Sequence, residues 1–159
     1  MSKFGLDLSA FVEKAKGNID AVVRKVVLDV GAELVVASPV GDASAWKNPP
    51  PKGYVGGRFR ANWQMGVNTT ISGALPNIDP TGAVSIERIA AAMPTIAAGN
   101  RYIITNNLPY AQRLEDGWSG QAPSGMVMKT VIRWNVIVDN AVNGVRAGGG
   151  DMAVGFKAY

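Results

Sequence analysis

The sequence predicts a single α+β domain in which an antiparallel sheet is packed by a long N-terminal helix and a C-terminal helix, with long Gly/Pro-rich loops. Three observations support this fold class. Apolar residues recur at helical spacing over residues 8–37, apolar and polar residues alternate over 58–71, and a second β-rich run occupies 101–105. The chain has 159 residues, 47% of them hydrophobic, which suits one domain with a sizeable core.

Residues 8–37 are predicted to form the first helix. Most of its apolar stripe is expected to pack on the chain's own sheet, with neighbouring subunits as the alternative. Gly17 and Gly31 each lower helix stability, so we expect a bend or a break near one of them. The stripe comprises Leu8, Phe11, Val12, Ala15, Ile19, Val22, Val23, Val26, Val27, Val30 and Leu34.

A long loop over residues 38–59 is expected to follow this helix. Three consecutive prolines at 49–51 stiffen it, and loops of this length are uncommon in compact domains unless they have a function or are disordered. Trp46 and Tyr54 argue against free disorder, because aromatic side chains are typical of contact surfaces. We therefore interpret residues 38–59 as an interface loop that docks onto an adjacent protein.

Residues 58–71 show the clearest strand pattern, which predicts one buried and one solvent-exposed face. Phe59, Ala61, Trp63, Met65 and Val67 alternate with Arg60, Asn62, Gln64 and Asn68. A Gly/Pro-rich loop is expected at 72–84, and a short helix from Ser85 to about Met93, where Pro94 ends it. A second strand at 101–105 is predicted to pair antiparallel with the first.

The second strand leads into a predicted corner within residues 101–126, RYIITNNLPYAQRLEDGWSGQAPSGM. Two turn signals, Asn106-Asn107 and Asp116-Gly117, flank a short amphipathic segment, and Trp118 follows. One interpretation is a corner of the core, because Tyr and Trp rings bury large areas. The other is a subunit contact, because Tyr, Trp and Arg are enriched at interfaces.

Residues 124–144 fit both a helix and a strand, and their length favours the helix. Ser124 is its expected cap and Asn143-Gly144 its expected stop. Its predicted apolar face comprises Val127, Val131, Trp134, Val138, Ala141 and Val145. We place the domain at residues 1–146, and we expect the glycine-rich tail, 147–159, to become ordered on a partner or to add a strand to a sheet.

The composition argues against an enzyme. The chain has no cysteine and no histidine, which removes thiolate chemistry, the commonest general base and the usual zinc ligands. Glu115-Asp116 is the only adjacent acidic pair, and we expect it to be solvated charge in a turn. We therefore predict no catalytic site, no metal and no cofactor.

The charge and hydropathy patterns indicate an ordinary solvated surface. The net charge of +4 is spread along the chain, which gives only weak support to a DNA-binding regulator. No apolar run is long enough to cross a bilayer, and the N-terminus lacks the apolar region of a signal peptide. We expect a protein that is made in the cytoplasm and has no membrane partner.

Two motifs together resemble a known family. One runs from SPVGD at 38–42 to KGYVGGRFRANW at 52–63, and the other is YIITNNLPYAQRLEDGWSGQAPSGMV at 102–127. They are similar to the tail-completion, or head–tail joining, proteins of tailed bacteriophages, which are also described as neck or minor tail proteins. The similarity covers most of the chain, and the NNLPYAQRLE core followed by Gly-Trp is its most specific part.

The resemblance implies a small α+β protein without enzymatic activity that forms a ring, most often a hexamer, at the joint between head connector and tail tube. The expected partners are copies of itself, the head connector or stopper protein, and the tail tube or tail terminator protein. The expected location is the neck of the virion, after synthesis in the host cytoplasm. Genomic DNA is expected to pass through the ring without sequence-specific binding.

The positions that match the family are signature residues rather than an active site. They are Gly57, Arg58, Arg60 and Trp63 at the strand entry, and Pro109, Tyr110, Ala111, Arg113, Leu114, Gly117 and Trp118 in the central motif. Asp42 stands at the usual acidic position, but an inserted Trp/Pro loop separates it from Gly57-Arg58. A tail terminator, which caps the tail tube, is the alternative within the same class of virion proteins.

Overall fold

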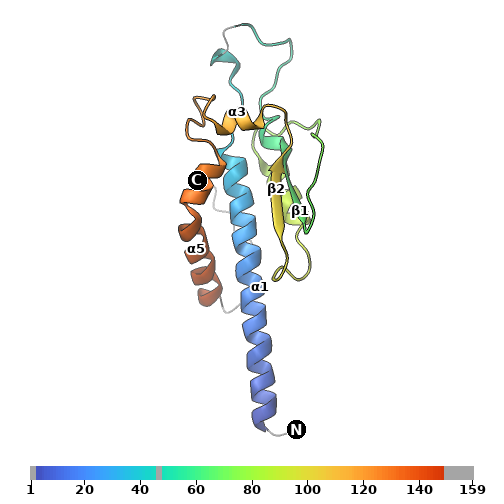
Figure 1. Ribbon diagram of the computed structural model, residues 1–159, viewed down its shortest axis with the longest axis vertical. Coiled ribbons are helices and arrows are strands. Elements are labelled where there is room, and N and C mark those ends of the chain that lie inside the picture. Colours follow the sequence, from blue (N-terminus) through green and yellow to red (C-terminus); the bar gives the residue numbers. More distant parts are fainter. Residues whose placement is uncertain (1–2, 46–47, 149–159) are drawn as a thin grey trace.

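The computed structural model describes residues 3–45 and 48–148 and has the α+β architecture that the sequence predicts (Figure 1). The elements in chain order are α1 (Lys3–Ala37), β1 (Trp63–Val67), α2 (Ala83–Ala91), β2 (Tyr102–Asn106), α3 (Ala111–Glu115), α4 (Val127–Ile132) and α5 (Trp134–Ala147). Two single-turn 3-10 helices, Ala43–Ala45 and Arg60–Asn62, precede β1. In the described part of the chain, the sheet has two strands.

Helix α1 is the central element of the fold. The sheet and α2 pack on one side of it, and α5 runs back alongside the other (Figure 1). The larger core contains Leu28, Leu34, Val35, Phe59, Trp63, Met65, Ile89, Leu108, Ala122 and Met126. The smaller core joins α1 to α5 through Val26, Ile137 and Ala141. One helix therefore contributes side chains to both cores.

Helix α1 runs without interruption, so the predicted break near Gly17 or Gly31 was wrong. Gly31 faces α2, and a Cβ atom placed there would lie 2.9 Å from Cγ2 of Ile89. The missing side chain lets α2 approach α1 closely. At Gly31, packing against α2 outweighs the helix propensity that the glycine loses, about 1 kcal/mol, whereas Gly17 has no neighbour within 4 Å of a Cβ position.

The two strands pair antiparallel as predicted, with Met65 opposite Ile104. The first strand is much shorter than residues 58–71, because the 3-10 helix Arg60–Asn62 precedes it and Asn68, at a positive φ of 60°, ends it. The predicted alternation is confirmed on the face that carries Phe59, Ala61, Trp63 and Met65, all of which are buried.

The opposite face of β1 is also covered, so the prediction of a solvent-exposed face was wrong. Asn62 and Gln64 are buried beneath the segment 71–75. The Gln64 amide donates to the Gly73 carbonyl at 2.9 Å, and the Asn62 amide donates to the Leu75 carbonyl at 3.2 Å and accepts the Leu75 N–H at 2.7 Å. These hydrogen bonds satisfy the amide groups that the segment removes from water.

The predicted helix over residues 124–144 is two helices, because the chain turns at Arg133 between α4 and α5. The second helix also continues past Asn143-Gly144 to Ala147. The turn lets α4 lie against the C-terminal end of α1 while α5 packs along its length. Arg133 holds this arrangement through an ion pair with Glu33 of α1, at 2.6 Å.

Helix α2 starts two residues before the predicted Ser85, because Asp79 caps it from the preceding loop. The Asp79 carboxylate accepts the N–H groups of Gly82 and Ser85, each at 2.8 Å, and the Ser85 hydroxyl at 2.7 Å. Burial raises the pKa of Asp79, but these hydrogen bonds outweigh burial and lower the pKa below its ordinary value.

Substitution of the two glycines of α1 tests whether α2 depends on the close approach. Gly31→Ala is expected to lower the free energy of unfolding by about 1–3 kcal/mol, because its methyl group forces the stiff, buried Ile89 aside. Gly17→Ala meets no neighbour within 4 Å and is expected to raise helix stability by up to about 1 kcal/mol. Urea unfolding followed by circular dichroism measures both. Equal stabilisation by the two substitutions would contradict the packing described here.

Candidate interaction surfaces

The first motif and the part of the second motif that follows β2 lie together at the C-terminal end of α1, although they are far apart in the chain (Figure 1). The backbone N–H of Val40, in the interface loop, donates to Oε1 of Gln121 at 2.9 Å. The rings of Phe59 and Tyr110 lie 6.1 Å apart between centroids. The motifs therefore form one structural unit, which joins the loop 38–59 to the corner 106–126.

Arg60 and Trp63 belong to the interior of this unit. Arg60 donates to the carbonyls of Val36 and Ser38 at 3.2 and 2.9 Å, where α1 ends, and to that of Pro80 at 2.6 Å. Trp63 is buried, and its Nε1–H donates to the Ser38 hydroxyl at 2.7 Å. A guanidinium group on the last carbonyls of a helix also complements the helix dipole. Both side chains thus terminate α1 and fix β1 to it.

The remaining signature residues of the corner divide between core and surface. Leu114 is half-buried and packs against the larger core, whereas Pro109 is exposed. Trp118 is 73% exposed, and its ring centroid lies 5.3 Å from Cζ of Arg113, within cation–π distance. The contact interpretation of the corner therefore suits Trp118, and the core interpretation suits Leu114.

Tyr110 marks the place where the interface loop reaches the corner. Burial raises the pKa of the Tyr110 hydroxyl, the charge of Arg58 lowers it, and Tyr54 raises it further. Arg58 is exposed, and the Tyr54 hydroxyl lies against Gly41. Trp46, also predicted as an interface residue, lies outside the described residues.

The most exposed apolar surface lies elsewhere, on α4 and the first turn of α5. We call it the α4–α5 surface, and its members are 44–75% exposed. It comprises Val127, Met128, Val131, Ile132, Trp134 and Val136. Val127, Met128, Val131 and Ile132 recur at the spacing of one helical face of α4, whereas Trp134 and Val136 point to different sides of α5. The exposed areas of the six side chains sum to on the order of 600 Å², which is comparable to the apolar area that one partner buries in a stable complex.

The sequence analysis placed Val127, Val131 and Trp134 on the buried face of one long helix, and this was wrong. Only the part of that face beyond the turn at Arg133 is buried or half-buried, at Val138, Ala141 and Val145. The signal available in the sequence was the run of apolar pairs at 127–128 and 131–132. Adjacent apolar residues widen the apolar stripe, so that a short helix cannot bury all of it on one side.

A second feature is the N-terminal part of α1, residues 3–19, which we call the α1 extension. It projects beyond the rest of the domain (Figure 1). The side-chain hydrogen bonds from α1 to the 94–98 loop begin at Asp20, which accepts the N–H groups of Ala97 and Ala98 at 2.5 and 2.9 Å. Val12 and Ile19 are 39% and 59% exposed.

Glu115 has a structural function that the sequence analysis missed. Its carboxylate accepts the N–H groups of Met126, Val127 and Met128 at 2.8–2.9 Å and so caps α4 in place of the predicted Ser124. Burial raises the pKa of Glu115, but the three hydrogen bonds outweigh burial and lower it below its ordinary value. The cap supports the first turn of α4, and with it the start of the α4–α5 surface.

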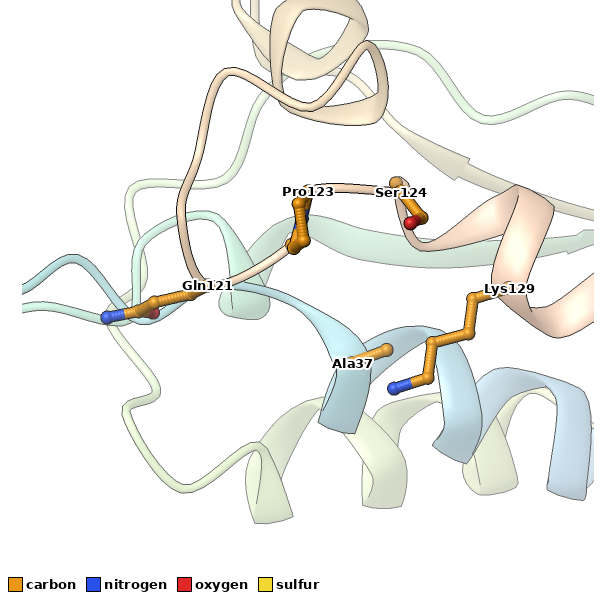
Figure 2. A pocket seen from close by; sticks show the side chains of 7 residues that line it. Ala37, Gln121, Pro123, Ser124 and Lys129 are labelled. Carbon is orange, nitrogen blue, oxygen red and sulfur yellow. The ribbon is translucent and has the colours of Figure 1, made fainter.

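A shallow pocket lies between the corner and the end of α1 (Figure 2). It is lined by Ala37, the segment 121–125 and Lys129, whose ammonium group points toward the last turn of α1. Its volume of about 200 Å³ is below the range of small-molecule sites, roughly 300–1,000 Å³. The described residues include no cluster of three acidic residues that could hold a metal ion, and no helix among them is long and apolar enough to cross a membrane.

Comparison with known proteins identifies no relative of this chain. No protein-family model, no curated protein and no solved structure matches it. The resemblance to tail-completion proteins therefore rests on the two sequence motifs. The function must be argued from those motifs and from the surfaces described above.

Glu115→Gln tests the cap through the pH dependence of stability. A lowered pKa in the folded state contributes stability above the ordinary glutamate pKa of about 4.3, and this contribution is lost as the pH falls through the lowered value. We expect Glu115→Gln to lower the free energy of unfolding by about 1 kcal/mol at pH 7, and by less at pH 3, because removing a helix cap typically has this effect. Urea unfolding at the two pH values measures the difference.

Asp116→Asn is the matched control, since Asp116 is the exposed neighbour whose carboxylate contacts only Gln112 among the hydrogen bonds described here. Asp20 and Asp79 also have lowered pKa values, so their protonation in acid also lowers the free energy of unfolding of the wild-type protein. The comparison is therefore between each variant and the wild type at the same pH. If Glu115→Gln lowers the free energy of unfolding by the same amount at pH 3 and pH 7, the proposed ionised cap is contradicted.

Proposed function

We propose that this protein is a structural component of the phage neck, which assembles into a ring between the head connector and the tail tube and lets the genome pass. The observation that carries the proposal is the α4–α5 surface, with six large apolar side chains exposed on two consecutive helices. Four of them, on α4, share one face of that helix, and an exposed apolar helix face is typical of a protein–protein contact. A protein that functions by assembly has a use for such a surface.

The sequence motifs supply the class of assembly. They are similar to those of tail-completion proteins, and they lie at one end of the molecule with the interface loop and the exposed Trp118. The α4–α5 surface begins at the same end, at Val127 of the second motif, and continues onto α5 along the side of α1. Contact regions on an end and on a side suit a ring subunit, which touches its own copies on its flanks and other virion proteins at its ends.

The proposed partners follow from this division. Copies of this chain contact one another in a ring, and the resemblance favours six copies. The connector or stopper protein of the head and the tube or terminator protein of the tail contact the ends of the ring. DNA makes no sequence-specific contact in the proposed ring, and the small net charge of +4 suits a channel that must not retain the phosphate backbone. We propose no enzymatic activity and no cofactor.

Loss of the gene from its phage tests the proposal. We expect lysates to contain filled or emptied heads and finished tails of normal length that are not joined, because the ring between them is missing. Electron microscopy of the lysates, with the gene supplied in trans as the control, measures the fraction of joined particles. Overlong tails would favour the tail terminator instead, and normal infectious particles would contradict both assignments.

The purified protein gives an independent test of the ring. We expect sedimentation velocity to show a single assembly of several copies at micromolar concentration, and negative-stain images to show closed rings. Duplex DNA binding that weakens steeply with salt, by a protein that stays monomeric, would favour the DNA-binding regulator.

A further inference from the structure

Two features at opposite ends of α1 have exposed apolar side chains within the described residues 3–45 and 48–148. The α4–α5 surface packs beside the C-terminal end, where Arg133 is bonded to Glu33. The α1 extension starts at the N-terminal end, and its hydrogen bonds to the 94–98 loop begin only at Asp20. Each feature has exposed apolar side chains, at Ile132 on one and at Ile19 on the other.

The two features cannot cover each other within one copy. Helix α1 is continuous, so Ile19 and Glu33 stay about 21 Å apart along its axis at 1.5 Å per residue. The ion pair from Arg133 and the cap from Glu115 hold α4 at its end of α1. Neither feature can therefore reach the other unless a second copy supplies it.

The α1 extension has a physical need for such a cover. It has 17 residues, and isolated helices of about 12–15 residues are marginal in water even when they are rich in alanine. This one includes Gly17 and β-branched residues, which lower helix propensity further. Its sequence also places apolar residues at 8, 12, 15 and 19, the spacing of one helical stripe.

We infer, on the basis of the proposed ring, that the α4–α5 surface of one copy packs on the α1 extension of the next copy. The contact joins two different surfaces. Each copy therefore uses its α4–α5 surface to bind one neighbour and its α1 extension to bind the other. Repeated head-to-tail contacts of this kind close into a ring when the rotation between neighbours allows it. The exposed areas of the six side chains of the α4–α5 surface, about 600 Å² in total, are the most apolar surface that this side can contribute, against the roughly 800 Å² per partner of a stable complex. An amphipathic helix laid on an apolar surface is a common mode of recognition.

The first test replaces one exposed isoleucine on the α4–α5 surface. Ile132→Lys puts a charge on the residue that is 75% exposed, where little packing within the copy is lost. We expect association to weaken by at least about 30-fold, as for loss of a central interface residue, and sedimentation velocity to show monomers where the wild type is assembled. Urea unfolding of the dilute variant checks that the monomer remains folded.

Ile78→Lys is the matched control, because it makes the same replacement at another exposed isoleucine, in the loop that precedes α2. This variant is expected to assemble like the wild type. Equal assembly by Ile132→Lys would overturn the inferred contact and leave the proposed ring standing. A wild type that is monomeric at every concentration would overturn both.

The second test identifies the two halves of the contact directly. The chain has no cysteine, so Val131→Cys and Val12→Cys each introduce a single thiol, both at exposed positions. A bismaleimide long enough to bridge two neighbouring helical turns is expected to link the two variants when they are mixed, and neither variant to itself. Linkage of Val131→Cys to itself would show a symmetric contact, and no linkage in an assembled mixture would exclude the α1 extension; either result overturns the inference.

Discussion

The fold depends on one helix being shared by two cores. Residues from Asp20 to Ala37 of α1 meet the sheet and α2 on one side and α5 on the other, so much of the surface of this half is covered. Burial of this kind stabilises a helix whose own sequence, with many valines and two glycines, is a weak helix former. Among the described side chains, those of residues 12–19 of the same helix belong to neither core. The contrast between the two halves is the main physical reason to expect a partner.

The end of α1 has a second organising function. Ser38, Arg60 and Trp63 form a hydrogen-bonded group that terminates the helix and anchors the first strand. The interface loop and the corner start from this group, so their exposed residues, among them Trp118, are presented from a rigid base. The positions that match the family therefore include interior residues, such as Arg60 and Trp63, and an exposed residue, Trp118. Rigid support of this kind is what a contact surface needs in order to bind without a large loss of entropy.

Local patterns were sufficient to predict much of the fold. The position of α1, the second strand, its antiparallel pairing and the buried face of β1 follow from periodicity within short windows. The predictions that were wrong concern contacts between distant segments. Burial of Asn62 and Gln64 depends on the segment 71–75, and the uninterrupted helix at Gly31 depends on Ile89 of α2. Neither partner can be identified from the spacing of residues alone.

The interaction surfaces were harder to predict for the same reason. Trp118 and Tyr54 carried an aromatic signal that pointed to contact, and the structure leaves both partly exposed. The α4–α5 surface was missed because the turn at Arg133, fixed by Glu33, redirects residues that a single helix would have buried. Glu115 looked like solvated charge, since its three hydrogen bonds reach residues 11–13 positions away. A cap supplied over that distance has no local sequence signature.

Hydrogen exchange along α1, measured residue by residue as a function of protein concentration, tests the central claim most directly. In dilute monomer, amides from Asp20 onward should exchange only on opening of the cores, while those of the α1 extension should exchange rapidly. On assembly, the extension should become protected and the boundary near Asp20 should disappear. Strong protection of the extension in dilute monomer, or rapid exchange that persists in the assembled protein, would contradict the account.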